Sequence, residues 1–254
     1  MSQPMILPTS ASSSDGPLLR ATMRLSSSVR VTGRHRHARG QLLGSTQGLL
    51  TVDAGDSRWV VPASHSVWIP PGVPHEVRSH GPFSGWSLYV APTVCAELHS
   101  EPCVLTVSGL LREAVARAAS WTTDALDATQ SRLAGVIFDE IRSAPHVALS
   151  LPMPRDTRVR RIAQALVERP DDDRRLKEWG DWAGVAPRTL TRLFITETGF
   201  TFTEWRQRVR LSKALEMLAT GRSVTAIALD LGYDNVSAFI ALFRRVFGVT
   251  PGRY

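Results

Sequence analysis

Residues 176–194 read LKEWGDWAGVAPRTLTRLF and contain the parts of a helix-turn-helix in order. A short apolar helix ends at a turn around Gly184, and Pro187 suits the first position of a second helix, where its missing N–H is not needed. On that second helix, Leu190 and Phe194 recur at helical spacing and are expected to face inward. Another face carries three polar side chains: Arg188, Thr191 and Arg192. The pattern predicts a helix-turn-helix over residues 176–196.

The polar face of the second helix has the chemistry to contact base pairs in a major groove. An arginine can donate two hydrogen bonds to O6 and N7 of one guanine, and a threonine can reach base edges or a thymine methyl group. The alternative is an ordinary helical hairpin whose arginines are only solvated. One short pattern does not separate these two interpretations.

A second copy of the pattern favours the DNA-binding interpretation. Ser223 is expected to cap a short helix, Gly232 to form the turn, and Asp234 to cap the next helix. The apolar stripe of that next helix is predicted to be Phe239, Leu242, Phe243 and Val246. The sequence therefore predicts a second helix-turn-helix over residues 224–247, with its turn glycine 48 residues after Gly184.

The two patterns are separated by residues 202–219, which read as one long helix with a buried apolar stripe. At 1.5 Å per residue, this helix is about 27 Å long. A rod of that length is expected to place the two recognition helices about 34 Å apart, in successive major grooves.

The charge distribution also favours a DNA partner for this end of the chain. The whole chain carries a formal net charge of +7. Residues 1–154 hold 12 Lys or Arg and 11 Asp or Glu, whereas residues 155–254 hold 18 and 12. Nearly all the excess positive charge is therefore C-terminal, where it can attract double-stranded DNA.

The rest of the chain predicts a two-domain α+β protein. Short β-like runs broken by glycine and proline fill residues 19–108 and predict a β-barrel or jelly roll. Apolar residues at helical spacing follow over residues 109–143, and these helices either cover the barrel or pair two subunits. Three prolines predict an interdomain linker over residues 144–156. The all-helical domain with both helix-turn-helix motifs then occupies residues 157–254.

The remaining segments point to a cytoplasmic protein. Residues 1–18 lack the basic and apolar regions of a signal peptide and are expected to form a disordered leader. The sequence has no run of 18 or more apolar residues that could span a membrane. Cys95 and Cys103 are too few for a disulfide-stapled fold, so reduced thiols are expected.

The C-terminal motifs together resemble the DNA-binding domain of the AraC/XylS family of transcription regulators. The resemblance covers about residues 155–254 and depends on several motifs in one order. These motifs are Arg188-Thr-Leu-Thr-Arg-Leu-Phe, Glu197-Thr-Gly, Trp205-Arg-Gln-Arg-Val-Arg-Leu, Ile227-Ala through Leu231-Gly-Tyr, Phe239 through Phe243-Arg-Arg-Val-Phe-Gly, and Thr250-Pro-Gly-Arg-Tyr.

The resemblance implies roles for residues on both recognition helices. On the first helix, the residues that read bases would be Arg188, Thr191 and Arg192. On the second helix, the corresponding residues are Val236, Ser237 and Ala241. Because members of the family often carry polar or charged groups at the second set, we expect weaker hydrogen-bond readout there, with Val236 and Ala241 touching thymine methyl groups. The residues expected to hold phosphates are Arg206, Arg244 and Arg245.

A histidine pattern marks the β half. His35 and His37 lie two residues apart and would share one face of a strand, and His75 follows the turn Pro70-Pro-Gly-Val-Pro. Three imidazoles can form three corners of a site for one divalent transition metal, with the Gln41 amide oxygen as a weak fourth ligand. The same residues could instead line a metal-free effector pocket, or only satisfy hydrogen bonds inside the barrel.

The histidine spacing resembles the two sequence motifs of cupins, in which a Glu usually stands at the position of Gln41. This resemblance implies a cupin-like sensor domain. Loss of the carboxylate removes one negative charge from the predicted metal site.

Together these patterns predict a sequence-specific DNA-binding transcription regulator rather than an enzyme. A small-molecule effector, bound in the cupin-like domain with or without a metal, is expected to control the DNA-binding arms. A homodimer and contact with RNA polymerase are further expectations for this class. Two alternatives stay open: a cupin metalloenzyme with a DNA-binding tail, and an effector-independent DNA-binding dimer.

Overall fold

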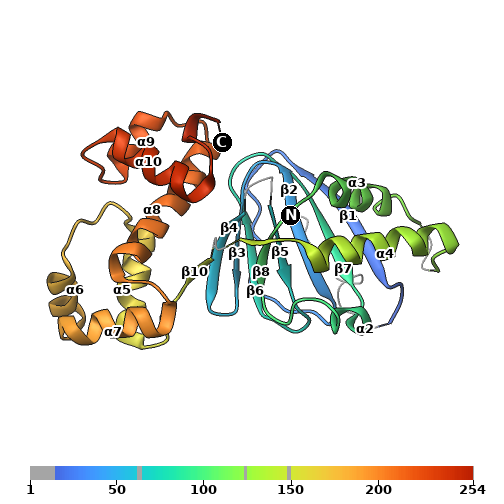
Figure 1. The fold of residues 1–254 in the computed structure, drawn as a ribbon, viewed down its shortest axis with the longest axis horizontal. Coiled ribbons are helices and arrows are strands. Elements are labelled where there is room, and N and C mark those ends of the chain that lie inside the picture. The colour runs from blue at the N-terminus through green and yellow to red at the C-terminus, as the bar shows by residue number, and fades with distance from the viewer. Residues whose placement is uncertain (1–14, 62–64, 123–124, 148–149, 254) are drawn as a thin grey trace. The chain divides into compact units, whose positions relative to one another are not determined.

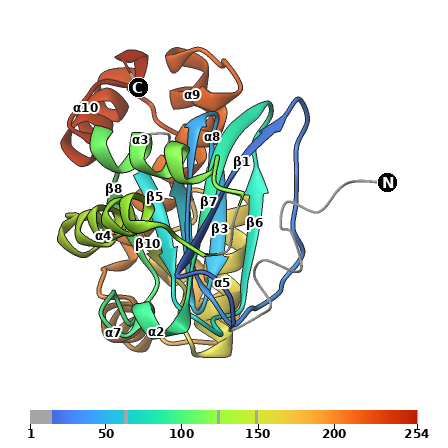
Figure 2. The same ribbon diagram turned by 90° about the vertical axis from the view of Figure 1, so that its right-hand side faces the viewer.

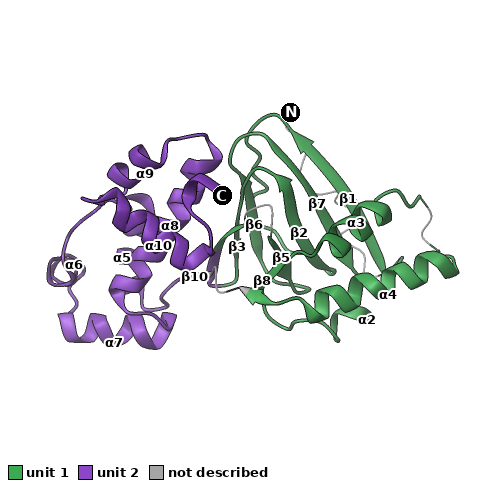
Figure 3. Ribbon diagram, turned by 45° about the horizontal axis from the view of Figure 1, so that its top comes forward, with its two compact units in different colours: residues 1–55, 59–150 green, residues 56–58, 151–254 purple. Residues whose placement is uncertain are grey.

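The chain, as a computed structural model, is described over residues 15–61, 65–122, 125–147 and 150–253. Figure 3 shows its two compact units. Residues 1–55 and 59–150 form unit 1, and residues 56–58 and 151–254 form unit 2. The division falls inside the predicted linker. That linker is not plain coil, because it contains two short strands: β9 (His146–Val147) and β10 (Ser150–Pro152).

Unit 1 contains one β-sheet and most of a second (Figure 1). The larger has the strand order β1-β7-β2-β5-β8-β9, and the smaller has β10-β4-β3-β6. The other strands are β1 (Leu19–Ser26), β2 (Gly40–Gln47), β3 (Leu50–Ala54), β4 (Ser57–Val61), β5 (His65–Ile69), β6 (His75–Ser79), β7 (Phe83–Val90) and β8 (Cys103–Thr106). The predicted N-terminal β domain is confirmed.

Alternation along the strands gives the larger sheet two buried faces. Leu42 in β2 and Trp68 in β5 pack in a core with the helices of unit 1. Their neighbours Leu43 and Val67 pack in a second core with residues of the smaller sheet. Successive side chains of a strand point to opposite sides, so one sheet can bury both faces.

Two helices cover one face of the larger sheet, as Figure 2 shows. They are α3 (Gly109–Ala118) and α4 (Ala128–Ser143), and the short helix α2 (Pro92–Cys95) precedes them. Leu111 and Val115 of α3, and Ile137 and Ile141 of α4, belong to the same core as the sheet residues. These contacts support the covering role, whereas pairing between subunits stays a prediction.

The first residues of the described chain are held by a buried arginine. The Arg39 guanidinium donates to the carbonyl oxygens of Asp15 and Pro17 at 2.9 and 2.8 Å. The Ala91 N–H donates to the carbonyl of Leu18 at 2.8 Å. Within the predicted leader, the carbonyls of Asp15, Pro17 and Leu18 thus bind neighbouring groups. The rest of the predicted leader lies outside the described residues.

Unit 2 is helical over its described residues after β10. Its helices are α5 (Thr157–Glu168), α6 (Leu176–Ala183), α7 (Pro187–Thr198), α8 (Phe202–Ala219), α9 (Val224–Asp230) and α10 (Val236–Phe247), followed by the 3-10 turn η1 (Pro251–Arg253). The pairs α6–α7 and α9–α10 are the two predicted helix-turn-helix motifs, and α8 joins them (Figure 1). No helix among the described residues is both long and apolar enough to cross a membrane.

Side-chain caps set the helix starts in the second motif. Ser223 accepts a hydrogen bond from the Ala226 N–H at 3.3 Å and caps α9 as predicted. Asn235 caps α10, because its Oδ1 accepts from the Ser237 N–H at 2.8 Å. The predicted cap, Asp234, is therefore wrong by one residue. Asp and Asn cap helices about equally well, so residue type alone could not decide between two adjacent candidates.

Candidate DNA-binding helices and histidine site

Two glycines shape the turn between α6 and α7. Gly184 ends α6 with a φ of +69°, a conformation that residues with a Cβ rarely adopt. A Cβ on Gly180 would lie only 2.5 Å from the carbonyl oxygen of Val185. The Val185 N–H donates to the carbonyl of Gly180 at 2.8 Å. This close backbone contact fixes the direction in which α7 leaves α6.

The first recognition helix, α7, presents the predicted side chains outward. Arg188 and Arg192 are exposed, whereas Leu190 is fully buried. Thr191 is half-buried, and its hydroxyl donates to the carbonyl of Pro187 at 3.0 Å. Rotation of this hydroxyl frees it for another acceptor. The helix thus carries two long cations and one hydroxyl toward solvent, and their base contacts stay a prediction.

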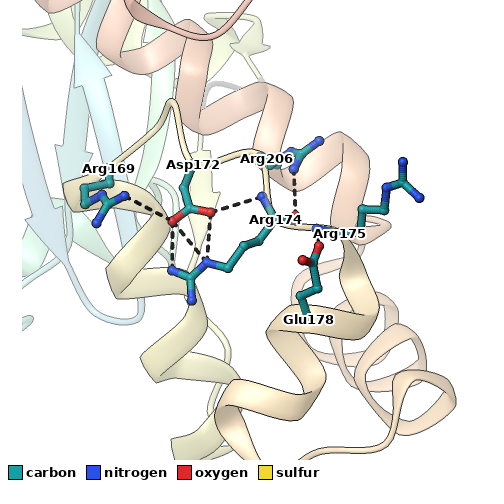
Figure 4. Close-up of polar contacts among 6 residues, drawn as sticks. All are labelled: Arg169, Asp172, Arg174, Arg175, Glu178 and Arg206. Carbon is teal, nitrogen blue, oxygen red and sulfur yellow. Dashed lines mark hydrogen bonds and ion pairs between the residues drawn. The ribbon is translucent and has the colours of Figure 1, made fainter.

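Figure 4 shows a buried carboxylate that holds the loop before α6. The Asp172 side chain is 5% exposed and lies 2.8 Å from Nη2 of Arg174. The Arg174 side chain beside it lowers the pKa of Asp172, so this carboxylate is charged at neutral pH. The same guanidinium lies 3.6 Å from the ring centroid of Trp179, which is fully buried. One arginine therefore ties the loop to the core of unit 2.

Arg206 has a contact that the sequence did not predict. Its side chain is half-buried on α8, and Nη1 donates to the carbonyl of Arg174 at 3.2 Å (Figure 4). Burial lowers the pKa of Arg206. The residue thereby connects α8 to the loop before α6, while its predicted phosphate contact stays a prediction.

The second recognition helix, α10, has a less polar outer face. Val236 is half-buried, and Ser237 and Ala241 are exposed in the first half of the helix. Arg244 and Arg245 are exposed in its last turn. A hollow of about 560 Å³ lies along this face and is lined by Ser237, Ile240, Ala241, Arg244, Arg245 and Thr250. The side chains on this face are small and weakly polar toward the start of the helix and positively charged toward its end.

The apolar stripe of α10 is narrower than predicted. Phe239 and Phe243 are fully buried, and their rings lie 5.8 Å apart between centroids. Leu242 is half-buried. Val246 is 41% exposed, so its prediction as a core residue is wrong. The apolar contact continues instead through Phe247, which is half-buried and whose ring centroid lies 4.5 Å from that of Phe243. Helical spacing allows both the i+3 and the i+4 residue, and it does not decide between Val246 and Phe247.

Backbone pairing brings three histidines of unit 1 together. His35 and His75 form an isolated antiparallel bridge, with N–H to carbonyl distances of 2.9 and 2.8 Å. The carbonyl of His37 accepts from the Gly72 N–H at 2.9 Å. The ring centroid of His75 lies 4.2 Å from that of His35 and 4.9 Å from that of His37. The gathering of these histidines predicted from their spacing is present.

Each of the three rings is oriented by a hydrogen bond to a backbone carbonyl. The Nδ1 distances are 2.9 Å from His35 to Gly33, 2.7 Å from His37 to Arg39 and 2.9 Å from His75 to Val73. A carbonyl only accepts, so in the neutral ring each Nδ1 carries the hydrogen and each Nε2 keeps a lone pair. Nε2 of His35 and of His75 are buried and have no hydrogen-bond partner among the described residues. One ligand atom from each of the three histidines lies within 4.8 Å of the others.

Burial keeps the rings of His37 and His75 neutral. It lowers the pKa of His75 to about 4 and also lowers the pKa of His37, because a charged imidazolium is poorly solvated there. At neutral pH both rings therefore offer lone pairs. Buried polar atoms normally have partners, so unpartnered Nε2 atoms point to a missing cation or hydrogen-bond donor.

Gln41 reaches the histidines from β2. Its Oε1 lies 3.1 Å from Nε2 of His37, and its Nε2 donates to Ser87 Oγ at 3.2 Å and to Tyr89 Oη at 3.4 Å. His37 Nε2 holds a lone pair, so it cannot donate to the amide oxygen of Gln41. Either the amide group flips so that its nitrogen donates to His37 Nε2, or the two atoms bind the same cation. The sequence did not predict Ser87 and Tyr89 as partners of Gln41. The one signal for them is that they lie two residues apart in β7 and therefore share one face of the strand.

A small cavity borders this site. Its volume is about 20 Å³ and its lining includes Arg24, Thr32, Gln41 and Ser87. That volume has room for about one water molecule. Arg24 brings a positive charge to the lining, and its buried Nε has no hydrogen-bond partner among the described residues.

The two units match known protein families. Residues 24–169 match the model of an AraC-like ligand binding domain, and residues 179–254 match that of a helix-turn-helix domain. The fold and these matches define the protein as a DNA-binding transcription regulator with an N-terminal ligand-binding domain. The chain belongs to the AraC family of transcription regulators, as its C-terminal motifs predicted.

Similar sequences include several bacterial regulators. The HTH-type transcriptional regulator NimR of Escherichia coli is 34% identical over 221 residues, which cover 87% of this chain and 81% of NimR. RipA of Corynebacterium glutamicum is 37% identical over 103 residues, 41% of this chain and 31% of RipA. The regulatory protein SoxS of Salmonella typhimurium is 41% identical over 73 residues, 28% of this chain and 68% of SoxS.

The similarity to solved structures is lower. A structure of ToxT from Vibrio cholerae is 10% identical, with a TM-score of 0.41, over 93% of this chain and 97% of that chain. The C-terminal domain of AraT from Geobacillus stearothermophilus is 30% identical, with a TM-score of 0.37, over 39% of this chain and 84% of that chain. The family assignment rests on the sequence matches.

Proposed function

We propose that this regulator binds a divalent transition metal through His35, His37 and His75 and uses the metal to bind its effector. One observation carries the proposal: three oriented imidazoles converge, and two of them have buried Nε2 atoms without a partner among the described residues. A histidine that donates Nδ1–H to a carbonyl is oriented as metal-ligating histidines usually are. The metal would supply an electrophilic anchor for oxygen or nitrogen atoms of a small molecule.

Gln41 fits a sensory role better than a catalytic one. Its amide is neutral, whereas a carboxylate at this position would add a charged ligand. The similar proteins whose names give a function are transcription regulators, which supports a non-enzymatic protein in the cytoplasm. We further infer that the chain acts as a homodimer and contacts RNA polymerase, as expected for a regulator of this class.

For DNA, we propose that α7 carries most of the base specificity. The exposed Arg188 and Arg192 match the bidentate donors that guanine recognition requires, and Thr191 adds a hydroxyl. The face of α10 offers Ser237 as its polar group near the start, together with Val236 and Ala241. Arg244 and Arg245 would hold phosphates, with Arg206 as a further candidate.

The metal proposal is tested by counting bound metal in the full-length chain. Metal-free protein is incubated with Zn²⁺, Ni²⁺, Co²⁺ or Fe²⁺, washed, and analysed by mass spectrometry of the metal content. We expect His75→Ala to remove one metal per chain. The matched control is His80→Ala, because His80 hydrogen bonds to Thr51 in the same domain and lies outside the histidine cluster.

The effector half of the proposal is tested by calorimetry with a panel of metabolites. The same panel is titrated into metal-loaded protein, chelated protein and the His75→Ala variant. Heat that appears only with the metal-loaded wild type supports the proposal. An unchanged metal content in His75→Ala, or equal effector binding by loaded and chelated protein, would contradict it.

A further inference from the structure

Unit 1 contains a second group of metal-ligating side chains, outside the histidine site. His99 lies in the loop between α2 and β8, Cys103 begins β8, and His146 begins β9. One ligand atom from each of these residues lies within 4.8 Å of the others. They come from three separate segments of the chain, and none of them belongs to a motif discussed above.

Two hydrogen bonds hold His99 without using its Nδ1. His99 Nε2 lies 3.1 Å from the carbonyl of Ile141, so Nε2 carries the hydrogen and Nδ1 keeps the lone pair. That carbonyl, in the last turn of α4, lacks a helical partner because the residue four positions on is Pro145, which has no N–H. Trp68 Nε1 donates to the carbonyl of His99 at 2.7 Å. The lone pair is thus oriented by the fold.

His146 faces this lone pair. Its Nε2 lies 3.1 Å from Nδ1 of His99, and the two rings meet edge to face with centroids 4.4 Å apart. In a tetrahedral zinc site with bonds of about 2.0–2.1 Å, two ligating nitrogens lie about 3.3 Å apart. The two nitrogens are therefore spaced as two ligands of one ion.

The β8–β9 ladder places Cys103 on the same face. His146 pairs with Leu105, and Cys103 shares the face of Leu105 because it lies two residues earlier in the strand. Cys103 is half-buried, and burial raises the pKa of its thiol to about 11. Without a metal, this sulfur therefore stays protonated and unreactive.

We propose that His99, Cys103 and His146 form a second metal site for Zn²⁺ or a similar transition metal, with two nitrogens and one sulfur as ligands. This donor set suits tetrahedral coordination, and the exposed side of His146 leaves the fourth position to water. On binding, the Cys103 thiol loses its proton to solvent. The hydrogen on His146 moves from Nε2 to Nδ1, so one proton is released for each ion.

An ion at this site would fasten β9 to the sheet. β9 is an edge strand that pairs with β8 through two residues. The chain enters unit 2 at residue 151, four residues after β9 ends. A bond from His146 to the ion would add an anchor at the start of this connection. Metal supply would thereby set how firmly the segment leading to the DNA-binding unit is held.

Cobalt spectroscopy on the full-length chain tests the coordination, because only a thiolate ligand gives a sulfur-to-cobalt charge-transfer band in the near ultraviolet. We expect the band in the wild type and in Cys95→Ser, and its loss in Cys103→Ser. His146→Gln changes a proposed ligand at an exposed position. It should lower the Co²⁺ affinity by more than the roughly 10–100-fold that is lost when a residue that only hydrogen bonds to a ligand is changed. Thermal melting of the metal-free variants confirms that each is folded.

The same experiment separates this site from the histidine site. His75→Ala should keep the band while losing one metal per chain, and Cys103→Ser should lose both the band and the other metal. Absence of the band from the wild type, or its persistence in Cys103→Ser, would overturn the second site whatever the result at His75.

Hydrogen exchange tests the anchor. We expect Zn²⁺ to slow exchange of the amides of residues 146 and 147 and of Thr106, whose N–H donates to the carbonyl of Pro145. The Cys103→Ser variant should show no such slowing. Equal exchange with and without Zn²⁺ in the wild type would overturn the anchoring role.

Discussion

His37 and Gln41 contact each other through two atoms that both carry lone pairs, Nε2 and Oε1, at 3.1 Å. The orientation of His37 is fixed by its Nδ1 hydrogen bond to Arg39 at 2.7 Å. At the residue scale, the character of the site therefore depends on the group at position 41. A neutral amide can rotate and donate, whereas a carboxylate can only accept and would favour a cation.

Replacing Gln41 with Glu should strengthen metal binding and weaken the metal-free fold. The added charge should raise Zn²⁺ affinity by at least about tenfold, equal to about 1.4 kcal/mol. Without metal, a carboxylate at this buried position should lower the free energy of unfolding by about 1–3 kcal/mol. Competition titration and thermal melting with and without Zn²⁺ measure both effects.

Ser87→Ala is the matched control for this change, because it removes one hydrogen-bond partner of Gln41 and adds no charge. It should not make stability depend more strongly on metal. If Gln41→Glu destabilised the protein equally in the presence and absence of Zn²⁺, the amide would not face a metal.

At the scale of helices, the start of α5 shows how local caps organise unit 2. Asp156 accepts hydrogen bonds from the N–H groups of Arg158 at 3.0 Å and Val159 at 3.4 Å. The Asp156 N–H donates to Glu197 Oε2 in α7 at 3.0 Å. The cap of α5 is thus connected to the first recognition helix.

The Asp156 cap should stabilise unit 2 in a pH-dependent way. Hydrogen bonds from the Arg158 side chain lower the pKa of Asp156 to about 2, below the unfolded value of about 3.9. A lowered pKa means that the stabilisation is complete above about pH 4 and is lost as the pH falls toward 2. Asp156→Ala should cost about 1 kcal/mol at pH 7 and little near pH 2, as measured by chemical denaturation.

Asp156→Asn separates the cap from the charge. It keeps a capping oxygen at every pH, so its stability relative to Asp156→Ala should not vary between pH 7 and pH 2. Asp181→Ala, which removes an exposed carboxylate paired with Lys177, is a control on surface charge. A cost of Asp156→Ala that stayed constant down to pH 2 would contradict the assignment.

The two recognition helices should respond differently to mutation. On an operator selected from random duplexes, Arg192→Ala should cost about 1–3 kcal/mol of binding free energy and relax the sequence preference at one base pair. Arg245→Ala should weaken binding on all sequences and reduce the salt slope by about 1, because a phosphate contact is lost. Fluorescence anisotropy at several salt concentrations measures both.

Ala241→Glu tests the groove assignment of α10, because it puts a negative charge on the face that would meet DNA. We expect binding to fall sharply. If Ala241→Glu and Arg192→Ala both left binding intact, the assigned faces of α7 and α10 would be wrong.

At the scale of the whole molecule, the two units have separate hydrophobic cores. Trp179, Phe194 and Trp205 belong to one cluster, and the strands and helices of unit 1 form two others. Leu151 is 2% exposed and belongs to the cluster of unit 2. The Trp205 indole donates to the carbonyl of Pro152 at 2.7 Å. Unit 2 therefore needs the residues of β10 to complete its core.

A fragment of residues 150–254 should fold and keep its sequence preference for DNA. Its ion pairs with Asp56, from Arg155 and Arg160, would be lost, but exposed pairs contribute only about 0–1 kcal/mol. We expect one cooperative thermal transition and no effect of metal on DNA binding. A fragment of residues 155–254, which lacks Leu151 and Pro152, should melt at a lower temperature.

Equal melting temperatures for the two fragments would show that β10 is not part of the core of unit 2. Non-cooperative melting of both would show that unit 2 depends on unit 1 for its fold.

Much of unit 2 could be predicted, because helix signals are local. The long helix over residues 202–219 follows from apolar spacing, and α8 has these bounds; α9 begins and α10 ends at the predicted limits of the second motif, residues 224 and 247. The errors are local too: the cap of α10 is Asn235, and Val246 is exposed. Asp and Asn cap helices about equally well, and helical periodicity does not decide whether Val246 or Phe247 packs on Phe243.

Less of unit 1 than of unit 2 could be predicted from the sequence. By itself the sequence determined the class of regulator and the paired helix-turn-helix motifs, which depend on short-range spacing and charge. The meeting of His75 with His35 and His37 followed from the resemblance to the cupin motifs, because a backbone bridge between distant segments holds these residues together. Only the tertiary structure decided that Gln41 meets Ser87 and Tyr89, and that His99 and Cys103 meet His146. Those meetings depend on which strands pair across the sheet, and the choice of partner strand comes from packing of the whole core rather than from any local pattern.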